Sequence, residues 1–411
     1  MKELFNLGDL YVSDFLKEGE EPRGGRVEMK MMFDEETKEV RLEKAAPSDV
    51  MYGRYWYRSG INETMKNELK SIVESIRHVK KLNAHDKWLD IACNDGTLLS
   101  FVPTNIVRIG VDPVEDSYKV EAEKHADIIV QDYFSKTALV QKAGWKEDHK
   151  FDVVTCIAMF YDLEDADSFL QDVHSVMDDN GLFVCQMSYT PLMIEQMAFD
   201  NICHEHIYYY TLYTIKNRFA KNGFKIVDVQ LNDINGGSFR VYAMRKDGDV
   251  RTFGTQPYRD VCDFRVKSLL HFEDISGYNI PAIWRVFFND LQRLKADVVS
   301  FVKKAKAEGK TVWGYGASTK GNTLLQYFGL DNTLIDGMAE RSPYKYGLRT
   351  VGTNIPIYSE EDMRKAKPDY LLVLPWHFIN EFRERESEYL KNGGAFIVPC
   401  PKFEIITGDS K

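Results

Sequence analysis

The sequence predicts an α/β protein built from two doubly wound domains and a small β-rich module that precedes them. Two observations support this fold class. Short apolar runs typical of buried strands alternate with helical patterns in two separate series, and each series begins with a strand, a glycine-containing turn and a helix. The chain also has 411 residues, which is too long for one compact core. We therefore expect three parts, at residues 1–60, 61–247 and 248–411.

The elements of the first two parts follow from hydrophobic periodicity. Residues 26–33 and 39–43 alternate apolar and polar side chains, which is typical of strands in a β-rich module. Aromatic residues cluster at 52–60, where we expect interdomain packing. Apolar residues then recur every three or four positions over 61–82, which predicts an amphipathic helix. The strands expected after it are 87–92, 106–111, 127–130, 151–157, 181–185, 224–229 and 238–243. Five alternating units and a hairpin predict a mostly parallel sheet with an antiparallel final strand.

The third part begins after a charged break at residues 245–249. Helical patterns continue to about residue 309, and a second α/β series follows them. Its strands are expected at 310–315, 333–336, 370–374 and 394–398. This series predicts a second parallel sheet.

Charge and cysteine usage exclude several classes of protein. The 63 acidic residues outnumber the 53 lysines and arginines, and a net charge of -10 argues against nucleic-acid binding. No apolar run approaches the roughly 20 residues that span a bilayer, and the first residues lack the pattern of a signal peptide. The six cysteines include no CxxC pair, as expected for free thiols in a reducing compartment. We expect a cytoplasmic protein without membrane contact that acts as a monomer or homodimer.

The first strand-to-helix turn, residues 90–97, predicts a nucleoside-type cofactor. A dinucleotide site needs G-x-G-x-x-G so that the backbone can approach a pyrophosphate, but only Gly96 is present here. S-adenosylmethionine, an adenosyl sulfonium without a pyrophosphate, therefore fits better than NAD. Asp112 and Asp132 end the next two strands, where carboxylates suit ribose hydroxyls and an adenine amine, although aspartates also end strands and cap helices without any ligand. The predicted cofactor-binding residues are Asp90, Ala92, Asn94, Gly96, Asp112, Asp132 and Met159.

A second glycine-rich turn, residues 314–323, predicts a phosphate site. It nearly matches a P-loop that begins at Gly316, but Asn322 stands where the lysine should be and Lys320 lies two positions early. Small residues, hydroxyls and a lysine at a helix N-terminus suit the diphosphate of a nucleotide substrate, with help from Lys345. The simpler alternative is a tight turn that binds nothing, and the turn at 235–240 can likewise be a plain hairpin. The predicted substrate-binding residues are Asn235, Ser238, Arg240, Ser318, Thr319, Lys320, Asn322 and Arg341.

Residues 201–210 carry the most reactive set of side chains in the sequence. A neutral imidazole accepts a proton near pH 7, a carboxylate orients it, and phenols donate to an oxygen that gains negative charge. This set favours enolisation beside a carbonyl, although a packed aromatic core is the simpler interpretation. The predicted catalytic residues are His206, Glu205, His204, Tyr208 and, from the earlier aromatic cluster, Tyr57. No cysteine or further histidine at the usual spacing adds a third ligand to the two histidines, so no metal site is expected.

Four motifs in this order make a family recognisable. They are Asp-Ile-Ala-Cys-Asn-Asp-Gly-Thr-Leu-Leu at 90–99, Cys-His-Glu-His-Ile at 203–207, Asn-Gly-Gly-Ser-Phe-Arg-Val-Tyr at 235–242 and Gly-Tyr-Gly-Ala-Ser-Thr-Lys-Gly-Asn-Thr at 314–323. The chain resembles S-adenosylmethionine-dependent sugar C-methyltransferases, which act on nucleotide-linked keto-deoxysugars. The resemblance extends from about residue 50 to the C-terminus and includes residues 347–357.

The resemblance implies a small N-terminal zinc-binding module, a central Rossmann-like methyltransferase domain and a Rossmann-like C-terminal domain that holds the nucleotide. It also implies that His206 is the general base with Glu205 beside it. By the same resemblance, Gly96, Asp112 and Asp132 surround the methyl donor.

The chain departs from the family pattern in three ways. No cysteine precedes Cys93, so the zinc ligands are missing and no zinc is expected. Cys203 stands where family members typically have a tyrosine, and Ala158 and Asp162 stand where they tend to have asparagine and histidine. The last two departures alter the expected sugar pocket.

The leading hypothesis is C-methylation next to a ketone on a nucleotide-linked deoxysugar, after His206 removes the α-proton. Tyr57, Tyr208 and Tyr209 are candidate hydrogen-bond donors to the enolate oxygen. A second hypothesis is O- or N-methylation of another nucleotide-linked sugar. A third is a non-catalytic relative that binds a nucleotide sugar.

Overall fold

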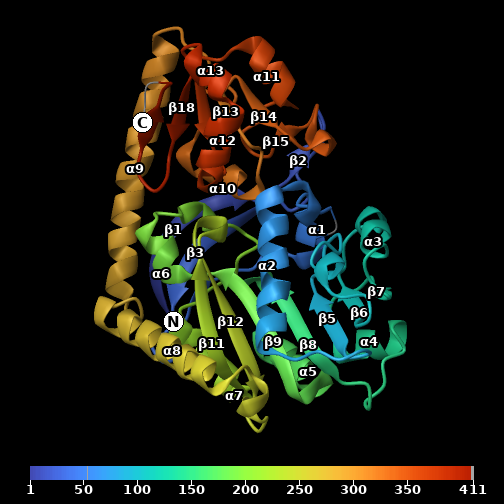
Figure 1. The fold of residues 1–411 in the computed structure, drawn as a ribbon. Helices are drawn as coiled ribbons and strands as arrows, with labels where there is room; N and C mark the ends of the chain where they lie inside the picture. The colour runs from blue at the N-terminus through green and yellow to red at the C-terminus, as the bar shows by residue number, and fades with distance from the viewer. Residues whose placement is uncertain (53, 409–411) are drawn as a thin grey trace.

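The computed structural model describes residues 1–52 and 54–408 and contains two large sheets with a smaller N-terminal sheet between them (Figure 1). Helix α9 (Pro281–Ala307) runs along one side of the molecule, from the level of the central sheet to that of the C-terminal sheet. Both large sheets carry helices on their faces, which confirms the predicted α/β fold class.

The central sheet has seven strands in the order β11-β12-β9-β8-β5-β6-β7. These are β5 (Lys87–Ile91), β6 (Val107–Val111), β7 (Ile128–Val130), β8 (Phe151–Ile157), β9 (Met177–Ser188), β11 (Phe224–Asn232) and β12 (Ser238–Arg245). Strand β5 pairs in parallel with β6 and β8, and β12 lies antiparallel between β9 and β11. The predicted parallel sheet with an antiparallel last strand is confirmed.

Helices cover both faces of the central sheet. They are α2 (Glu63–Val79), α3 (Asp116–Ala122), α4 (Lys136–Lys142), α5 (Ala166–Val176), α6 (Thr190–Glu195), α7 (Leu212–Lys221) and α8 (Gln256–Ser276). The apolar side of α2 shares one core with Trp88 and Val153, while α5 and α7 share another with residues such as Val154 on the opposite face. The alternation of Val153 and Val154 between two cores is the period of two that a strand requires. Among the described residues, no helix combines the length and apolar character needed to cross a membrane.

The C-terminal sheet has six strands in the order β16-β14-β13-β17-β18-β19, of which only β19 is antiparallel to its neighbour. They are β13 (Val312–Tyr315), β14 (Gly337–Glu340), β16 (Ile357–Ser359), β17 (Tyr370–Val373), β18 (Ala395–Val398) and β19 (Glu404–Ile406). The helices of this region are α10 (Thr319–Phe328), α11 (Glu360–Ala366), α12 (Ile379–Arg385) and α13 (Ser387–Lys391).

The strand predicted at 333–336 is wrong, because the strand begins at Gly337. Residues 331–335 form a turn in which the Asp331 carboxylate accepts the Thr333 N–H and the Asp331 carbonyl accepts the Ile335 N–H. Ile335 is fully buried, so its apolar side chain anchors a turn rather than a strand. A short apolar run does not distinguish these two cases.

The N-terminal sheet has the order β1-β3-β4-β10. Its strands are β1 (Lys2–Tyr11), β3 (Arg26–Phe33), β4 (Val40–Leu42) and β10 (Tyr208–Tyr209). A short helix, α1 (Ser48–Tyr52), follows β4 in the chain. The sequence predicted β3 and β4 but not β1, and it did not predict that residues 208–209 would complete this sheet. Because β10 comes from the middle of the chain, the expected division at residues 1–60, 61–247 and 248–411 stays a prediction.

Hydrogen bonds attach the N-terminal segment to helix α10. The amide of Gln326 accepts the Tyr11 N–H at 2.8 Å and donates to the Tyr11 carbonyl at 3.1 Å. The Asn322 amide donates to the carbonyl of Asp14 at 3.0 Å, and the short strand β2 (Phe15–Leu16) pairs with β15 (Arg349–Thr350). These contacts hold the start of α10 against the N-terminal segment.

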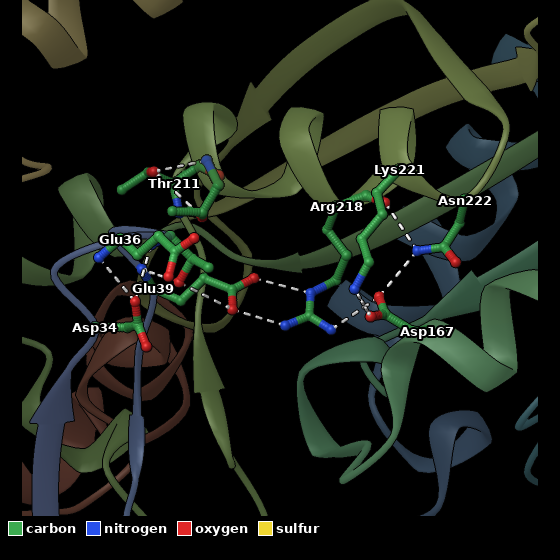
Figure 2. Close-up of polar contacts among 10 residues, drawn as sticks. Asp34, Glu36, Glu39, Asp167, Thr211, Arg218, Lys221 and Asn222 are labelled. Atoms are coloured by element: carbon green, nitrogen blue, oxygen red, sulfur yellow. Dashed lines mark hydrogen bonds and ion pairs between the residues drawn. The ribbon is translucent and has the colours of Figure 1, made fainter. Parts of the chain in front are cut away.

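An ion-pair network attaches the N-terminal sheet to the central domain (Figure 2). The Arg218 guanidinium on α7 donates to both carboxylate oxygens of Glu39, at 2.9 and 2.7 Å, and to Asp167 at 3.2 Å. Lys221 and Asn222 also donate to Asp167. A two-pronged contact between arginine and a carboxylate fixes orientation as well as distance, so this network fixes β10, just before α7, against β4.

Candidate active site

The turn after β5 has the backbone shape of a ligand-binding loop. Ala92, Asn94 and Gly96 all have positive φ, at 59°, 51° and 76°. The Asn94 N–H donates to one oxygen of the Asp112 carboxylate at 2.8 Å, and the Val114 N–H donates to the other at 3.1 Å. Each oxygen therefore keeps a lone pair for a further donor. Burial raises the pKa of Asp112 to about 6. This carboxylate suits a pair of ribose hydroxyls, and the loop fits the adenosyl group of S-adenosylmethionine.

Asp90 supports this loop from below. Its carboxylate accepts a hydrogen bond from the Thr155 hydroxyl at 2.6 Å, and the Thr155 hydroxyl accepts one from the Trp88 indole at 3.0 Å. Burial raises the pKa of Asp90 to about 7. Asp90 thus joins β5 to β8 beneath the loop.

Residues 57–60 lie over the same loop. The Asn94 side chain accepts the Ser59 N–H at 3.1 Å and donates to the Tyr57 carbonyl at 3.0 Å, while Asp95 accepts the Gly60 N–H at 2.8 Å. Tyr57 is fixed through its backbone, and 42% of the residue is exposed. Its predicted catalytic role stays a prediction.

Asp132 and Met159 lie at the ends of two other strands of the sheet. The Asp132 carboxylate pairs with Lys142 at 2.8 Å, which lowers its pKa, and about 40% of its side chain is exposed. Met159 follows β8 and is half-buried. Both positions are compatible with the predicted adenine contact.

Gly96 is required by the close approach of α3. A Cβ at this position would lie 2.7 Å from Cα of Ala122, whereas a Cβ at Gly144, which also has positive φ, would meet nothing within 4 Å. We expect Gly96→Ala to lower the free energy of unfolding by about 1–3 kcal/mol more than Gly144→Ala, because overpacking adds to a backbone strain that both variants share. Urea denaturation of the two variants measures this difference. Equal losses would contradict the steric explanation.

His206 is the centre of the second half of the site. Its Nδ1 lies 2.7 Å from the carbonyl oxygen of Asn201. A carbonyl only accepts, so Nδ1 carries the proton and Nε2 keeps its lone pair. Burial, assisted by the Lys320 ammonium, holds the pKa of His206 well below its usual range. The imidazole is therefore neutral and can accept a proton at Nε2.

His204 has a different environment from His206, and its predicted catalytic role stays a prediction. The segment makes a turn in which the His206 N–H donates to the Cys203 carbonyl, and this turn separates the two rings. His204 Nε2 lies 3.3 Å from the carbonyl of Val27 in the N-terminal sheet, and burial lowers the pKa of His204 to about 4. Two histidines two positions apart point the same way only on a strand.

Tyr208 also contacts other groups than His206 does, and its predicted catalytic role stays a prediction. Its ring stacks on Tyr210 with centroids 5.5 Å apart, and the Arg218 guanidinium lies 4.9 Å from its ring centre. It belongs to the network that joins the N-terminal sheet to α7. Tyr209, the next residue along β10, has a buried hydroxyl without a hydrogen-bond partner among the described residues.

Three further tyrosines surround the base, and the sequence did not predict them as site residues. The Tyr161 ring centre lies 4.2 Å from that of His206. Burial raises the pKa of Tyr52, Tyr55 and Tyr161 well above the usual range, and the charges of Asp162 and Glu205 add to this effect. Asp112 also raises the pKa of Tyr55, so one phenol lies within electrostatic reach of both halves of the site. The aromatic cluster at 52–60 was the signal for Tyr52 and Tyr55.

Two carboxyl groups, those of Glu205 and Asp162, act electrostatically on these tyrosines. Burial raises the pKa of Glu205 to about 7 against the opposing effect of Lys320. Burial and the neighbouring Glu205 raise the pKa of Asp162 well above its usual range. Perturbed carboxyl groups beside a neutral imidazole are typical of a catalytic site.

Cys203 completes a set of side chains that could bind a metal. Its thiol, a carboxylate oxygen of Glu205 and a ring nitrogen of His206 all lie within 4.8 Å of one another. His204 is not part of this group, so the expectation that no metal is bound through the two histidines stays a prediction. The Lys320 ammonium acts electrostatically on all three groups and so competes with a cation at this point.

Lys320 reaches this pocket from the C-terminal domain. Its ammonium donates to the side-chain oxygen of Asn201 at 2.5 Å, and Asn201 is the residue whose carbonyl binds His206. Asn201 also accepts from Ser188 at 3.3 Å and donates to the Asn235 carbonyl at 3.4 Å. The predicted substrate residues Lys320 and Asn235 thus both meet the histidine segment.

Arg240 is held by contacts within the central domain, and its predicted role as a substrate contact stays a prediction. Its guanidinium pairs with Glu68 on α2 at 2.7 Å and donates to Gln186 at 2.9 Å and Ser71 at 3.0 Å. The hydroxyl of Ser238 is likewise satisfied by the carbonyl of Ile234 at 2.9 Å. Both side chains are buried.

The remaining predicted phosphate contacts mostly serve the turn itself. The Ser318 hydroxyl caps α10 by accepting the Gly321 N–H, and the Thr319 carbonyl accepts from Ser13. Lys345 is buried and donates to the Ala317 carbonyl at 2.6 Å. Arg341 is half exposed and lies 3.6 Å from Glu381, so it stays available to a ligand. The Asn322 side chain is buried, and its amide donates to the Asp14 carbonyl while its side-chain oxygen has no hydrogen-bond partner among the described residues.

Comparison with known proteins agrees with this arrangement. Residues 61–229 match the family model of a methyltransferase domain, and residues 233–401 match that of a C-methyltransferase C-terminal domain. The chain is therefore a methyltransferase. Its C-terminal part is similar to the C-terminal domain of C-methyltransferases.

Two characterised proteins are similar in sequence. The C-methyltransferase NovU of Streptomyces niveus is 29% identical over 374 residues, which cover 90% of this chain and 86% of that protein. The sphingolipid C9-methyltransferase of Komagataella phaffii is 28% identical over 141 residues, which cover 31% of this chain and 27% of that protein.

Among solved structures, the magnesium protoporphyrin IX methyltransferase of Synechocystis is 14% identical, with a TM-score of 0.31 over 44% of this chain and 79% of that chain. The YcgJ protein of Bacillus is 12% identical, with a TM-score of 0.34 over 44% of this chain and 99% of that chain. Such low TM-scores carry no functional argument.

Proposed function

We propose that this methyltransferase transfers a methyl group from S-adenosylmethionine to a carbon next to a ketone on a nucleotide-linked deoxysugar, by base-assisted enolisation. The observation that supports this most is the tautomer of His206, whose Nδ1–H is held by the Asn201 carbonyl so that Nε2 is a free proton acceptor. Methylation at carbon requires removal of the α-proton, and a neutral buried imidazole suits this deprotonation. Methylation at oxygen or nitrogen does not require it.

Each of these residues has a separate role in the proposed reaction. His206 Nε2 takes the α-proton, and the electron pair of the C–H bond forms an enolate whose oxygen takes the negative charge. Tyr209 is one donor for that oxygen, because its buried hydroxyl is unpaired among the described residues. Asp112 and the loop at 92–96 hold the adenosyl group, and S-adenosylmethionine supplies the methyl group to the enolate carbon.

Two observations support a nucleotide-linked sugar as the substrate. NovU is similar to this chain over 86% of its own length and is named a C-methyltransferase. The C-terminal domain presents Arg341 half exposed near the end of β14, where a parallel sheet binds ligands. A nucleotide held there would place its sugar toward Lys320 and the histidine segment.

Deuterium exchange tests this proposal without methyl transfer. The protein is incubated in D2O with thymidine- and uridine-diphosphate keto-deoxysugars and S-adenosylhomocysteine, and mass spectrometry follows the α-carbon. We expect deuterium to enter at this carbon, and the same carbon to be methylated when S-adenosylmethionine is added. Methylation of oxygen or nitrogen without exchange would refute the proposal, as would binding of the sugar nucleotide with neither exchange nor methylation.

A further inference from the structure

Lys320 contacts the segment that carries His206 rather than lying at a separate phosphate site. Its ammonium and the His206 ring bind the same residue, since Asn201 accepts from Lys320 Nζ at its side-chain oxygen (2.5 Å) and from His206 Nδ1 at its carbonyl (2.7 Å). The cation is thereby held two hydrogen bonds from the proposed base. Lys320 comes from the first turn of α10, and that turn is fixed by the N-terminal segment through Ser13 and Asn322.

The surroundings of Lys320 suit a single buried negative charge better than a diphosphate. The titratable groups whose protonation responds to the Lys320 charge are Asp162, Asp200, Cys203, Glu205, His206 and His377. Three of these are carboxyl groups whose pKa burial raises, and burying the several charges of a diphosphate among such groups is costly. A neutral ketone avoids that cost, and its oxygen becomes charged only during reaction.

Lys320 also has donors to spare. An ammonium carries three N–H groups, and the Asn201 oxygen takes one of them. The surrounding phenols are weaker partners for an oxyanion, because burial raises the pKa of Tyr52, Tyr161 and Tyr209 well above the usual range. A hydrogen bond from a charged donor is roughly twice as strong as one from a neutral donor.

We propose that Lys320 is a catalytic residue that donates a hydrogen bond to the ketone oxygen of the substrate as this oxygen becomes an enolate. This inference rests on the proposed function. When His206 takes the α-proton, the C–H electron pair forms a C=C bond and the carbonyl π pair moves to the oxygen beside Lys320. The reverse movement of electrons drives the enolate carbon onto the methyl group, the S–CH3 pair stays on sulfur, and the ketone is restored.

The test compares Lys320→Met with Lys320→Arg in the full-length protein. The first readout is α-hydrogen exchange in D2O without a methyl donor, and the second is the Kd for thymidine and uridine diphosphate, measured by calorimetry. We expect Lys320→Met to slow exchange by about 10²- to 10³-fold, the usual effect of losing one oxyanion donor. We expect the Kd of the nucleotide to stay within about threefold. Lys320→Arg, which keeps the charge, should recover part of the exchange rate.

The outcomes separate the possible roles. A Kd that rises tenfold or more with exchange unchanged would make Lys320 a phosphate contact and overturn the inference. If the circular dichroism spectrum shows that Lys320→Met alone is unfolded, the folded Lys320→Arg variant decides the question. Exchange in Lys320→Arg that is as slow as in Lys320→Met would then overturn the inference. Absence of exchange in the unaltered protein would instead refute the proposed function itself.

Discussion

Replacement of His206 by asparagine is expected to lower kcat for methyl transfer by about 10²- to 10⁴-fold, the contribution of a well-placed general base. Asparagine retains a side-chain donor for the Asn201 carbonyl but has no basic nitrogen in place of Nε2. The affinity for S-adenosylmethionine should stay nearly unchanged, because Asp112 and the loop that contains Asn94 follow the strands β6 and β5 rather than the segment that carries His206. Steady-state kinetics and calorimetry measure the two quantities.

His204→Asn is the matched control for this variant. His204 is buried in the same turn, but its Nε2 binds the carbonyl of Val27 rather than facing the pocket. We expect this variant to lose stability, which a thermal melt measures. Its kcat should fall far less than that of His206→Asn, which steady-state kinetics measure. Full activity of His206→Asn would remove His206 from the mechanism, and equal losses in the two variants would mean that both act through folding.

The fold was predictable because its signals are local. The strands β5, β8 and β12 and the helix α2 have clear hydrophobic periodicity, and each was predicted within a few residues. The strand β10 was not, since residues 208–209 have no alternating pattern of their own and pair with β4 from far along the chain. Pairing between distant segments leaves no mark in a short window of sequence.

The site was predictable to the level of the segment but not of each side chain. The 203–207 motif identified His206, and the structure separates it from His204 by a turn that no spacing rule indicated. Lys320 was predicted as a ligand contact for a phosphate, whereas its partner is Asn201. Hydrogen bonds across domains decide such assignments, and single-sequence patterns carry no information about them.

Arg240 was predicted as a substrate contact, and the structure places its guanidinium in a buried ion pair. The sequence offered no sign that Glu68, on the helix α2, would pair with it. The pair is almost fully buried, with 6% and 11% of the two side chains exposed. Its role is to join β12 to α2.

Arg240→Leu is therefore expected to lower the free energy of unfolding by about 3–5 kcal/mol, because it leaves the Glu68 carboxylate buried without its cation. Urea denaturation measures the loss. The KM for the sugar nucleotide should be unchanged in the protein that remains folded. A KM raised tenfold with unchanged stability would instead restore Arg240 as a substrate contact.

The double variant Glu68→Leu/Arg240→Leu separates loss of the ion pair from loss of packing. Replacing a buried ion pair by apolar side chains of similar size often costs little stability, whereas removing one partner leaves the other charge buried and unpaired. We therefore expect the double variant to be more stable than Arg240→Leu alone, with a coupling energy of about 1–3 kcal/mol in the mutant cycle. Strictly additive losses would show that Arg240 stabilises the fold through Gln186 and Ser71 rather than through the charge of Glu68.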